Sequence, residues 1–123
     1  MLLKIDLESE RPIYLQIRDQ VVAAIARGEL AEGERLPSIR QLAADLGVNV
    51  HTVHRAYDLL RQQGFLRVRG RGGAVVRRPA SSGEPGEFPA EWERRARRLL
   101  EEARARGLTR ARILARLGEL MDA

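Results

Sequence analysis

The sequence predicts a mostly α-helical protein with a small β-hairpin, in which a winged helix-turn-helix domain is followed by a two-helix hairpin. Residues 12–64 hold three segments with apolar residues at helical spacing, and each segment ends at a glycine. Residues 65–76 alternate apolar and basic residues around a glycine-rich centre, which is typical of a hairpin. A stretch rich in proline, glycine and serine then precedes a second helical region.

Length and composition limit the class of protein. The chain has 123 residues, of which 44% are hydrophobic and 4% aromatic, so it can form one modest core and an extension. It has no cysteine, which excludes disulfides, thiolate zinc sites and cysteine nucleophiles and fits a reducing compartment. The first residues do not form a signal peptide, and no apolar run is long enough to span a membrane. We therefore expect a cytoplasmic protein without a membrane partner.

The net charge of +5 is concentrated in the middle of the chain. Residues 34–78 carry nine basic and three acidic side chains, whereas residues 1–33 carry four and six and residues 79–123 carry nine and eight. Every basic residue except Lys4 is arginine, a side chain that suits recognition of phosphate and guanine. The charge alone is also compatible with an ordinary solvated basic face.

Start and stop signals delimit the first two predicted helices. The first helix begins at Pro12 and ends at Gly28. Its apolar positions are Ile13, Ile17, Val21, Ala24 and Ile25. The second helix follows Ser38, which stands at capping-box spacing from Gln41, and it ends at Gly47. Only a few residues then remain before the third helix, as a helix-turn-helix requires.

The third predicted helix is capped by Asn49 and runs to Gly64. Its inward positions are Val50, Val53, Ala56, Tyr57 and Leu60. With a rotation of about 100° per residue, the positions that point away from the core are His51, Arg55, Asp58 and Gln62, with Thr52 and His54 on the two flanks. The N-terminal half of the second helix of such a motif enters the major groove, so this polar set predicts a DNA-contacting surface.

The predicted hairpin has a basic tip. Its strands comprise Phe65, Leu66 and Val68, then Ala74, Val75 and Val76, joined by a tight turn at Gly70 to Gly73. Arg69 and Arg71 belong to the tip. The glycine run opens no helix, so it does not predict a nucleotide-binding loop. Three helices followed by such a hairpin predict a winged helix-turn-helix.

These motifs carry a family resemblance. The stretch "GERLPSIRQLAADLGVNVHTVHRAYDLLRQQGFLRVRGRGGAVV" resembles the DNA-binding domain of the GntR family of bacterial transcription regulators. The segments "PIYLQI" and "NVHTVHRAY" are similar to its YtrA subfamily in particular, and the resemblance covers residues 5–77. It implies a homodimeric repressor that binds a palindromic operator in double-stranded DNA and often controls transporter genes.

The resemblance also implies which residues contact DNA. Carried over position by position, they are Arg40, Asn49, His51, Thr52, Arg55, Arg69, Gly70, Arg71 and Gly72. Arg40 would reach a phosphate or a base near the centre of the half-site. Val50 and His51 stand where the subfamily often has proline and asparagine, and Gly73 stands where the family usually has threonine. The bases recognised at the first two positions and one backbone contact of the wing therefore stay open.

The last third of the chain predicts a dimerisation element. Residues 79–90 are expected to be a linker between the DNA-binding domain, residues 1–78, and a helical hairpin, residues 91–123. Gly107 separates the two helices, and Thr109 caps the second. Two helices alone cannot enclose their apolar stripes, so we expect two copies to pair in a four-helix arrangement. The residues expected to form this homodimer are Trp92, Leu99, Leu100, Ile113, Leu114, Leu117 and Leu120.

The same region places acidic and basic side chains four residues apart. The pairs are Glu91–Arg95, Glu93–Arg97, Arg97–Glu101 and Arg98–Glu102. Such pairs stabilise an exposed helical face by about 0.2–0.5 kcal/mol each. We therefore interpret the arginine-rich run at residues 94–98 as a solvated face rather than a second DNA site.

The sequence allows three other interpretations. His51, His54 and Asp58 could bind a metal, but the two histidines lie about 60° apart around the helix and the chain has no third histidine. An enzyme would be indicated by a pair of carboxylates or by a nucleophile with a neighbouring base, and the sequence shows neither pattern. A winged helix could also be a protein–protein adaptor without specific DNA binding, since fold does not fix function. We expect no cofactor and no metal, and the sequence identifies no small-molecule effector.

Overall fold

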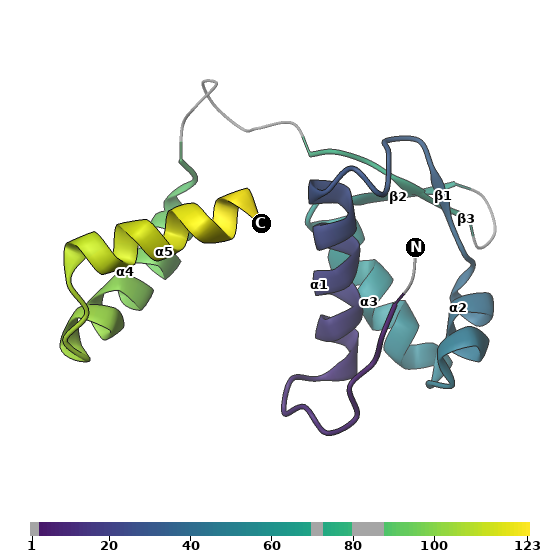
Figure 1. The fold of residues 1–123 in the computed structure, drawn as a ribbon. Helices are drawn as coiled ribbons and strands as arrows, with labels where there is room; N and C mark the ends of the chain where they lie inside the picture. The colour runs from purple at the N-terminus through teal and green to yellow at the C-terminus, as the bar shows by residue number, and fades with distance from the viewer. Residues whose placement is uncertain (1–2, 70–72, 80–87) are drawn as a thin grey trace. The chain divides into compact units, whose positions relative to one another are not determined.

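The computed structural model describes residues 3–69, 73–79 and 88–123 of the chain, which divides into two units, Met1–Ala80 and Ser81–Ala123 (Figure 1). The first unit holds α1 (Ile13–Ala26), β1 (Arg35–Leu36), α2 (Ile39–Leu46), α3 (Val50–Gln62), β2 (Leu66–Arg69) and β3 (Gly73–Val76). The second unit holds α4 (Ala90–Ala105) and α5 (Arg110–Asp122). The predicted fold class, mostly helical with a small hairpin, is confirmed.

One hydrophobic core lies inside the first unit. Both α1 and α2 pack against α3, and the sheet packs against the same helix through β2. The largest side chains that are fully buried there are Ile17, Val21, Leu30, Val53, Leu60 and Val76. Four of them come from the apolar stripes of the first and third predicted helices. Burial of these stripes fixes how α3 is rotated, and therefore which of its side chains face solvent.

Local caps set the helix boundaries around the turn. The Ser38 hydroxyl accepts a hydrogen bond from the Gln41 backbone N–H at 3.1 Å, as the capping-box spacing predicts. Gly47 ends α2 with a φ of 67°, a left-handed conformation that glycine adopts without strain. α1 begins one residue later than predicted, at Ile13, because Pro12 itself is still extended, with a ψ of 144°.

The sheet has three strands instead of the predicted two. Its order is β1-β3-β2, and all neighbours are antiparallel. In β2 and β3, Leu66 pairs with Val76 and Val68 pairs with Ala74, in agreement with the predicted hairpin. The added strand is β1, where Leu36 pairs with Ala74. Two residues are too short for an alternating pattern, so the sequence alone predicts a turn for this segment.

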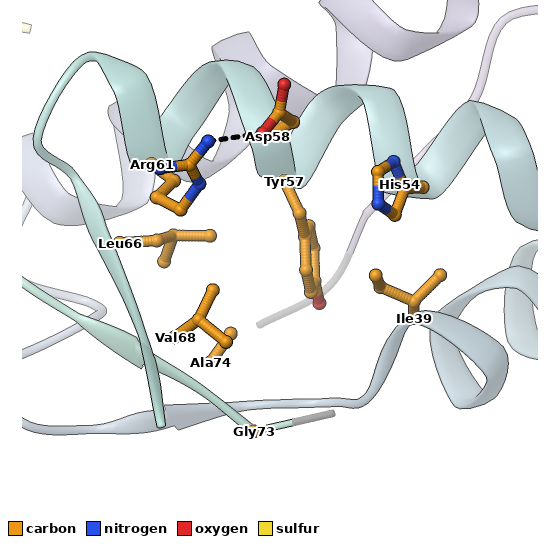
Figure 2. Close-up of a pocket in the computed structure, with 9 residues that line it drawn as sticks. All are labelled: Ile39, His54, Tyr57, Asp58, Arg61, Leu66, Val68, Gly73 and Ala74. Carbon is orange, nitrogen blue, oxygen red and sulfur yellow. Dashed lines mark hydrogen bonds and ion pairs between the residues drawn. The ribbon is translucent and has the colours of Figure 1, made fainter. Parts of the chain in front are cut away.

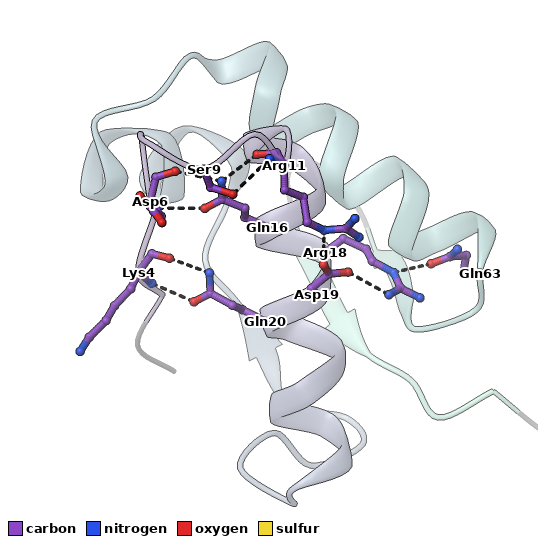
Figure 3. A network of polar contacts seen from close by, with 9 residues as sticks. All are labelled: Lys4, Asp6, Ser9, Arg11, Gln16, Arg18, Asp19, Gln20 and Gln63. Carbon is purple, nitrogen blue, oxygen red and sulfur yellow. Dashed lines mark hydrogen bonds and ion pairs between the residues drawn. The ribbon is translucent and has the colours of Figure 1, made fainter. Parts of the chain in front are cut away.

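Two glutamines of α1 fasten the N-terminal segment to the helix (Figure 3). The side chain of Gln20 accepts from the Lys4 backbone N–H at 2.8 Å and donates to the Lys4 carbonyl at 2.7 Å. One turn earlier, Gln16 accepts from the Asp6 N–H at 2.9 Å and donates to the Asp6 carbonyl at 3.0 Å. Each side-chain amide therefore bonds both the N–H and the carbonyl of one residue of the extended segment, as the backbone of a neighbouring β-strand would.

An ion-pair cluster at α1 is expected to make folding stability depend on pH. The Asp19 carboxylate lies 2.6 Å from Arg11 Nε and 3.1 Å from an Arg18 guanidinium nitrogen. Burial acts to raise the pKa of Asp19, but the hydrogen bonds and charges of both arginines outweigh it and lower that pKa below its ordinary 3.8. The charged carboxylate is therefore favoured in the folded protein.

Asp19→Asn should lower the free energy of unfolding at neutral pH by about 1 kcal/mol or less, since partly exposed ion pairs contribute little. A depressed folded pKa gives stability that is complete above the unfolded pKa and is lost as the pH falls through the folded value. Urea unfolding of both proteins from pH 7 into acid measures this. The difference should shrink below about pH 4; a constant difference would exclude the carboxylate charge as its cause.

The second unit lacks a core within the described residues. Neither α4 nor α5, both of which are described in full, contains a buried residue. The Thr109 hydroxyl caps α5 by accepting from the Arg112 N–H at 3.2 Å, as predicted. Of the four predicted ion pairs within α4, only Glu93–Arg97 forms, at 3.7 Å. Glu102 pairs instead with Arg106 at 3.2 Å, beyond the C-terminal end of α4.

Candidate nucleic-acid interface

The N-terminal half of α3 presents the polar face that the helical rotation predicts. His51, His54 and Arg55 are exposed and Thr52 is partly exposed, whereas Val53 on the opposite side is completely buried. The prediction for Val50 is wrong, because 45% of this side chain is exposed. Val50 is the first residue of α3 and lies outside the core cluster. The exposed face of the helix is therefore wider at its start than predicted.

Arg55 leans toward α1 and stacks on an aromatic ring. Its guanidinium carbon lies 3.9 Å from the centroid of the Tyr14 ring, well inside the range of a cation–π contact. This pair lies in an open groove of about 520 Å³. We call it the α1–α3 groove. It is lined by Pro12, Ile13, Tyr14, His51, Thr52 and Arg55. Tyr14 is absent from the predicted site, because nothing local in the sequence links it to a residue of α3.

Asn49 has a structural role in addition to the DNA contact expected from the resemblance. Its side-chain oxygen accepts a hydrogen bond from the His51 backbone N–H at 2.8 Å and caps α3. The cap holds the first turn of the helix in place. It therefore orients His51 and Thr52, whatever else Asn49 contacts.

A second hollow of about 180 Å³ separates α3 from the wing (Figure 2). It is lined by Ile39, His54, Tyr57, Asp58, Arg61, Leu66, Val68, Gly73 and Ala74. Tyr57 crosses it from α3 and donates a hydrogen bond from its hydroxyl to the Pro37 carbonyl at 2.7 Å. Burial raises the pKa of Tyr57, and its side chain belongs to the core. Tyr57 is therefore a core aromatic, as predicted, and Phe65 packs against the same core while partly exposed.

Asp58, the acidic residue of α3, forms hydrogen bonds with side chains of the same helix. Asp58 accepts hydrogen bonds from an Arg61 guanidinium nitrogen at 2.7 Å and from the Gln62 amide at 2.8 Å. The hydrogen bond from Arg61 lowers the pKa of the Asp58 carboxyl. The Asp58 charge is thus compensated by a side chain of the next turn of the same helix. In the described ranges no three His, Asp or Glu side chains come together as metal ligands would.

The remaining predicted site residues lie on α2 and the wing. Arg40 is exposed on α2. The backbone of Arg69 ends β2 opposite Gly73. Gly70, Arg71 and Gly72, the predicted wing contacts, lie outside the described residues. The helices that the structure describes include none with the length and apolar character needed to cross a bilayer.

Comparison with known proteins identifies the family. The model of the bacterial regulatory proteins of the gntR family matches residues 13–76, which span α1 to β3. The chain belongs to the GntR family. Its resemblance to YtrA is also confirmed: it is 39% identical over 72 residues to the HTH-type transcriptional repressor YtrA of Bacillus subtilis, covering 58% of this chain and 55% of that protein. This GntR protein is therefore a DNA-binding transcription regulator and not an enzyme.

Other GntR relatives extend the likeness. The HTH-type transcriptional regulator Rv1152 of Mycobacterium tuberculosis is 34% identical over 120 residues, which cover 98% of this chain and 94% of that protein. The solved structure of YtrA from Sulfolobus acidocaldarius, a GntR-family transcription factor, has a TM-score of 0.68 and 42% identity, covering 85% and 99% of the two chains. The DNA-binding domain of AraR in complex with operator ORE1 has a TM-score of 0.51 and 26% identity, covering 62% and 93%.

Proposed function

We propose that this chain is a homodimeric repressor that binds a palindromic DNA operator, with α3 of each subunit in the major groove. The observation that carries the proposal is the exposed first half of α3, which presents polar and basic side chains and no acidic one. The AraR domain with a similar fold is in complex with an operator, and the Bacillus subtilis relative is named a repressor. The first supports operator binding and the second supports repression as the function of this chain.

The proposed contacts divide between bases and phosphates. His51, Thr52, His54 and Arg55 lie on the part of α3 that would meet base edges. Asn49 and Arg40 would contact the DNA backbone or a base beside them. The wing residues Arg69, Gly70, Arg71 and Gly72 would hold the flanking phosphates. Phosphate contacts set the position of the protein on DNA, whereas base contacts select the sequence.

The apolar face of α4 and α5 supports the proposed homodimer. Between 38% and 61% of each of these side chains is exposed: Trp92, Leu99, Leu100, Leu114, Leu117 and Leu120. Burying one large apolar side chain contributes about 1.5–3 kcal/mol, so several together can hold two chains. The nine basic and eight acidic side chains of residues 79–123 nearly balance, so two copies would not repel strongly. We therefore propose residues 91–123 as the dimerisation hairpin and residues 79–90 as the linker.

Selection of bound fragments from a random DNA pool tests this function. The full-length protein should enrich a palindrome whose half-sites are centred about 10 base pairs apart, one turn of B-DNA. The spacing follows because the two symmetry-related DNA-binding domains must contact the same face of the duplex. No enriched sequence, or an enriched sequence without internal symmetry, would contradict a dimer that reads two equal half-sites.

Arg55→Ala and Arg71→Ala should weaken binding in different ways. If Arg55 contacts a base, its removal should cost about 1–3 kcal/mol on the selected operator and relax selectivity there. Arg71→Ala should weaken all sequences alike, because a phosphate contact carries no sequence information. Arg27→Ala removes the same charge at the opposite end of α1 from the groove and should change neither property. Binding titrations on the operator and on a scrambled duplex compare the three, and identical profiles for Arg55→Ala and Arg71→Ala would show that the roles are wrongly assigned.

A further inference from the structure

We infer that Tyr14 of α1 is a positioning residue for Arg55: its ring holds the guanidinium where α3 presents it to DNA. The inference rests on the proposed function, since it concerns the same surface. It adds a residue that lies outside the helix-turn-helix and the wing. It also gives α1 a part in recognition in addition to its part in the core.

The support for the Tyr14 ring comes from the core. Tyr14 is partly buried and packs against the core cluster, while the Arg55 guanidinium lies 3.9 Å from the ring centroid. α1 and α3 are packed against each other, so the ring and the start of the Arg55 side chain are held by two elements of the same core. Arg55 therefore has a fixed aromatic surface beside it before any DNA arrives.

A second arginine–aromatic contact among the described residues of the first unit shows what is particular about Arg55. Arg18 lies 5.9 Å from the Phe65 ring and also donates to Gln63 at 2.9 Å and to Asp19 at 3.1 Å. Two of its N–H donors are therefore bound by the protein, and the bond to Gln63 links α1 to the end of α3. For Arg55, the described residues provide the ring but no hydrogen-bond or ion-pair partner.

A ring is a suitable support for an arginine that must still bind something else. Stacking uses the flat face of the guanidinium and leaves the N–H groups at its edges free for a phosphate or a base. It also restricts the rotamers of a long side chain in advance. Less conformational entropy is then lost when DNA binds, which favours the complex by about 2- to 10-fold in affinity for one side chain.

A double-mutant cycle tests the inference. Operator and scrambled duplex are titrated with the wild type, Tyr14→Phe, Tyr14→Ala, Arg55→Ala and the Tyr14→Ala/Arg55→Ala double variant. Tyr14→Phe keeps the ring and should bind as the wild type does. Tyr14→Ala should lose about 2- to 10-fold in operator affinity, but it should change nothing once Arg55 is already alanine. Additive losses in the double variant, or a loss in Tyr14→Phe equal to that in Tyr14→Ala, would overturn the inference.

A measurement without DNA separates this inference from the proposed function. In the free protein, the ring current of Tyr14 should shift the Arg55 side-chain proton resonances upfield in the wild type and in Tyr14→Phe. The shift should disappear in Tyr14→Ala. Unshifted resonances in the wild type would overturn the positioning role even if operator binding is specific. A wild type that does not distinguish operator from scrambled DNA would overturn the proposed function, and the inference with it, whatever the resonances show.

Discussion

The chain cut after Arg78 should remain folded, become monomeric, and bind the operator about 10²- to 10⁴-fold more weakly than the full-length protein. The fragment keeps the whole hydrophobic core, because every buried residue of the described chain lies before Arg78. It loses the apolar face of α4 and α5, which we propose joins two subunits. Without that link each half-site is bound independently, so the gain from simultaneous binding disappears.

Sedimentation of the fragment and the full-length chain, combined with titration of one and two half-sites, measures this effect. Fragment and full-length protein should bind a single half-site alike and differ only on the full operator. Leu99→Glu with Leu117→Glu should reproduce the loss in the uncut chain, since both side chains are on the proposed interface. Leu7→Glu makes the same kind of change at an exposed leucine of the first unit and should have no effect. A full-length monomer, or a fragment that binds the operator as tightly as the intact protein, would overturn the assignment of the hairpin.

Raising the salt concentration from 50 to 200 mM should lower operator affinity by about 10³- to 10⁵-fold if the dimer contacts six to ten phosphates. The reason is counterion release: the slope of log affinity against log salt is about −0.9 for each phosphate neutralised. We propose that the excess of basic side chains in residues 34–78 supplies these contacts. Titrations at several salt concentrations give the slope directly.

The wing offers an internal check on that slope. Arg71→Ala should make it less steep by about 0.9 for each phosphate that the variant no longer neutralises, and a symmetric dimer carries this change twice. Arg27→Ala carries the same charge change outside the interface and should leave the slope as it is. A flat salt response of the wild type would contradict DNA binding through arginine–phosphate contacts and favour a protein–protein adaptor.

Much of the fold was predictable because its signals are local. The caps at Ser38, Asn49 and Thr109 act on backbone groups two or three residues away, so a short stretch of sequence contains the whole interaction. The exposed face of α3 was predictable for a related reason. Once Val53 is placed in the core, the rotation per residue fixes the direction of the positions around it, and only Val50 at the start of the helix departs from the prediction by being exposed.

What escaped prediction depends on partners distant in sequence. β1 exists because Leu36 pairs with Ala74, and two residues leave no pattern of their own. Gln16 and Gln20 look like ordinary helix-surface amides until the N-terminal segment lies beside them. The contact between Tyr14 and Arg55 joins α1 to α3, and either residue alone has several plausible roles. Such pairs require the packing of the helices to be known first.

The most direct test of sequence-specific binding is the ratio of the affinities of the full-length protein for its selected operator and for a scrambled duplex of equal length at the same salt concentration. Competition between the two duplexes measures it. Recognition of base edges by α3 in both subunits predicts a ratio of at least about 10³. A ratio near one would leave only the attraction of a basic surface for phosphate, and would contradict a sequence-specific regulator that acts through His51, Thr52, His54 and Arg55.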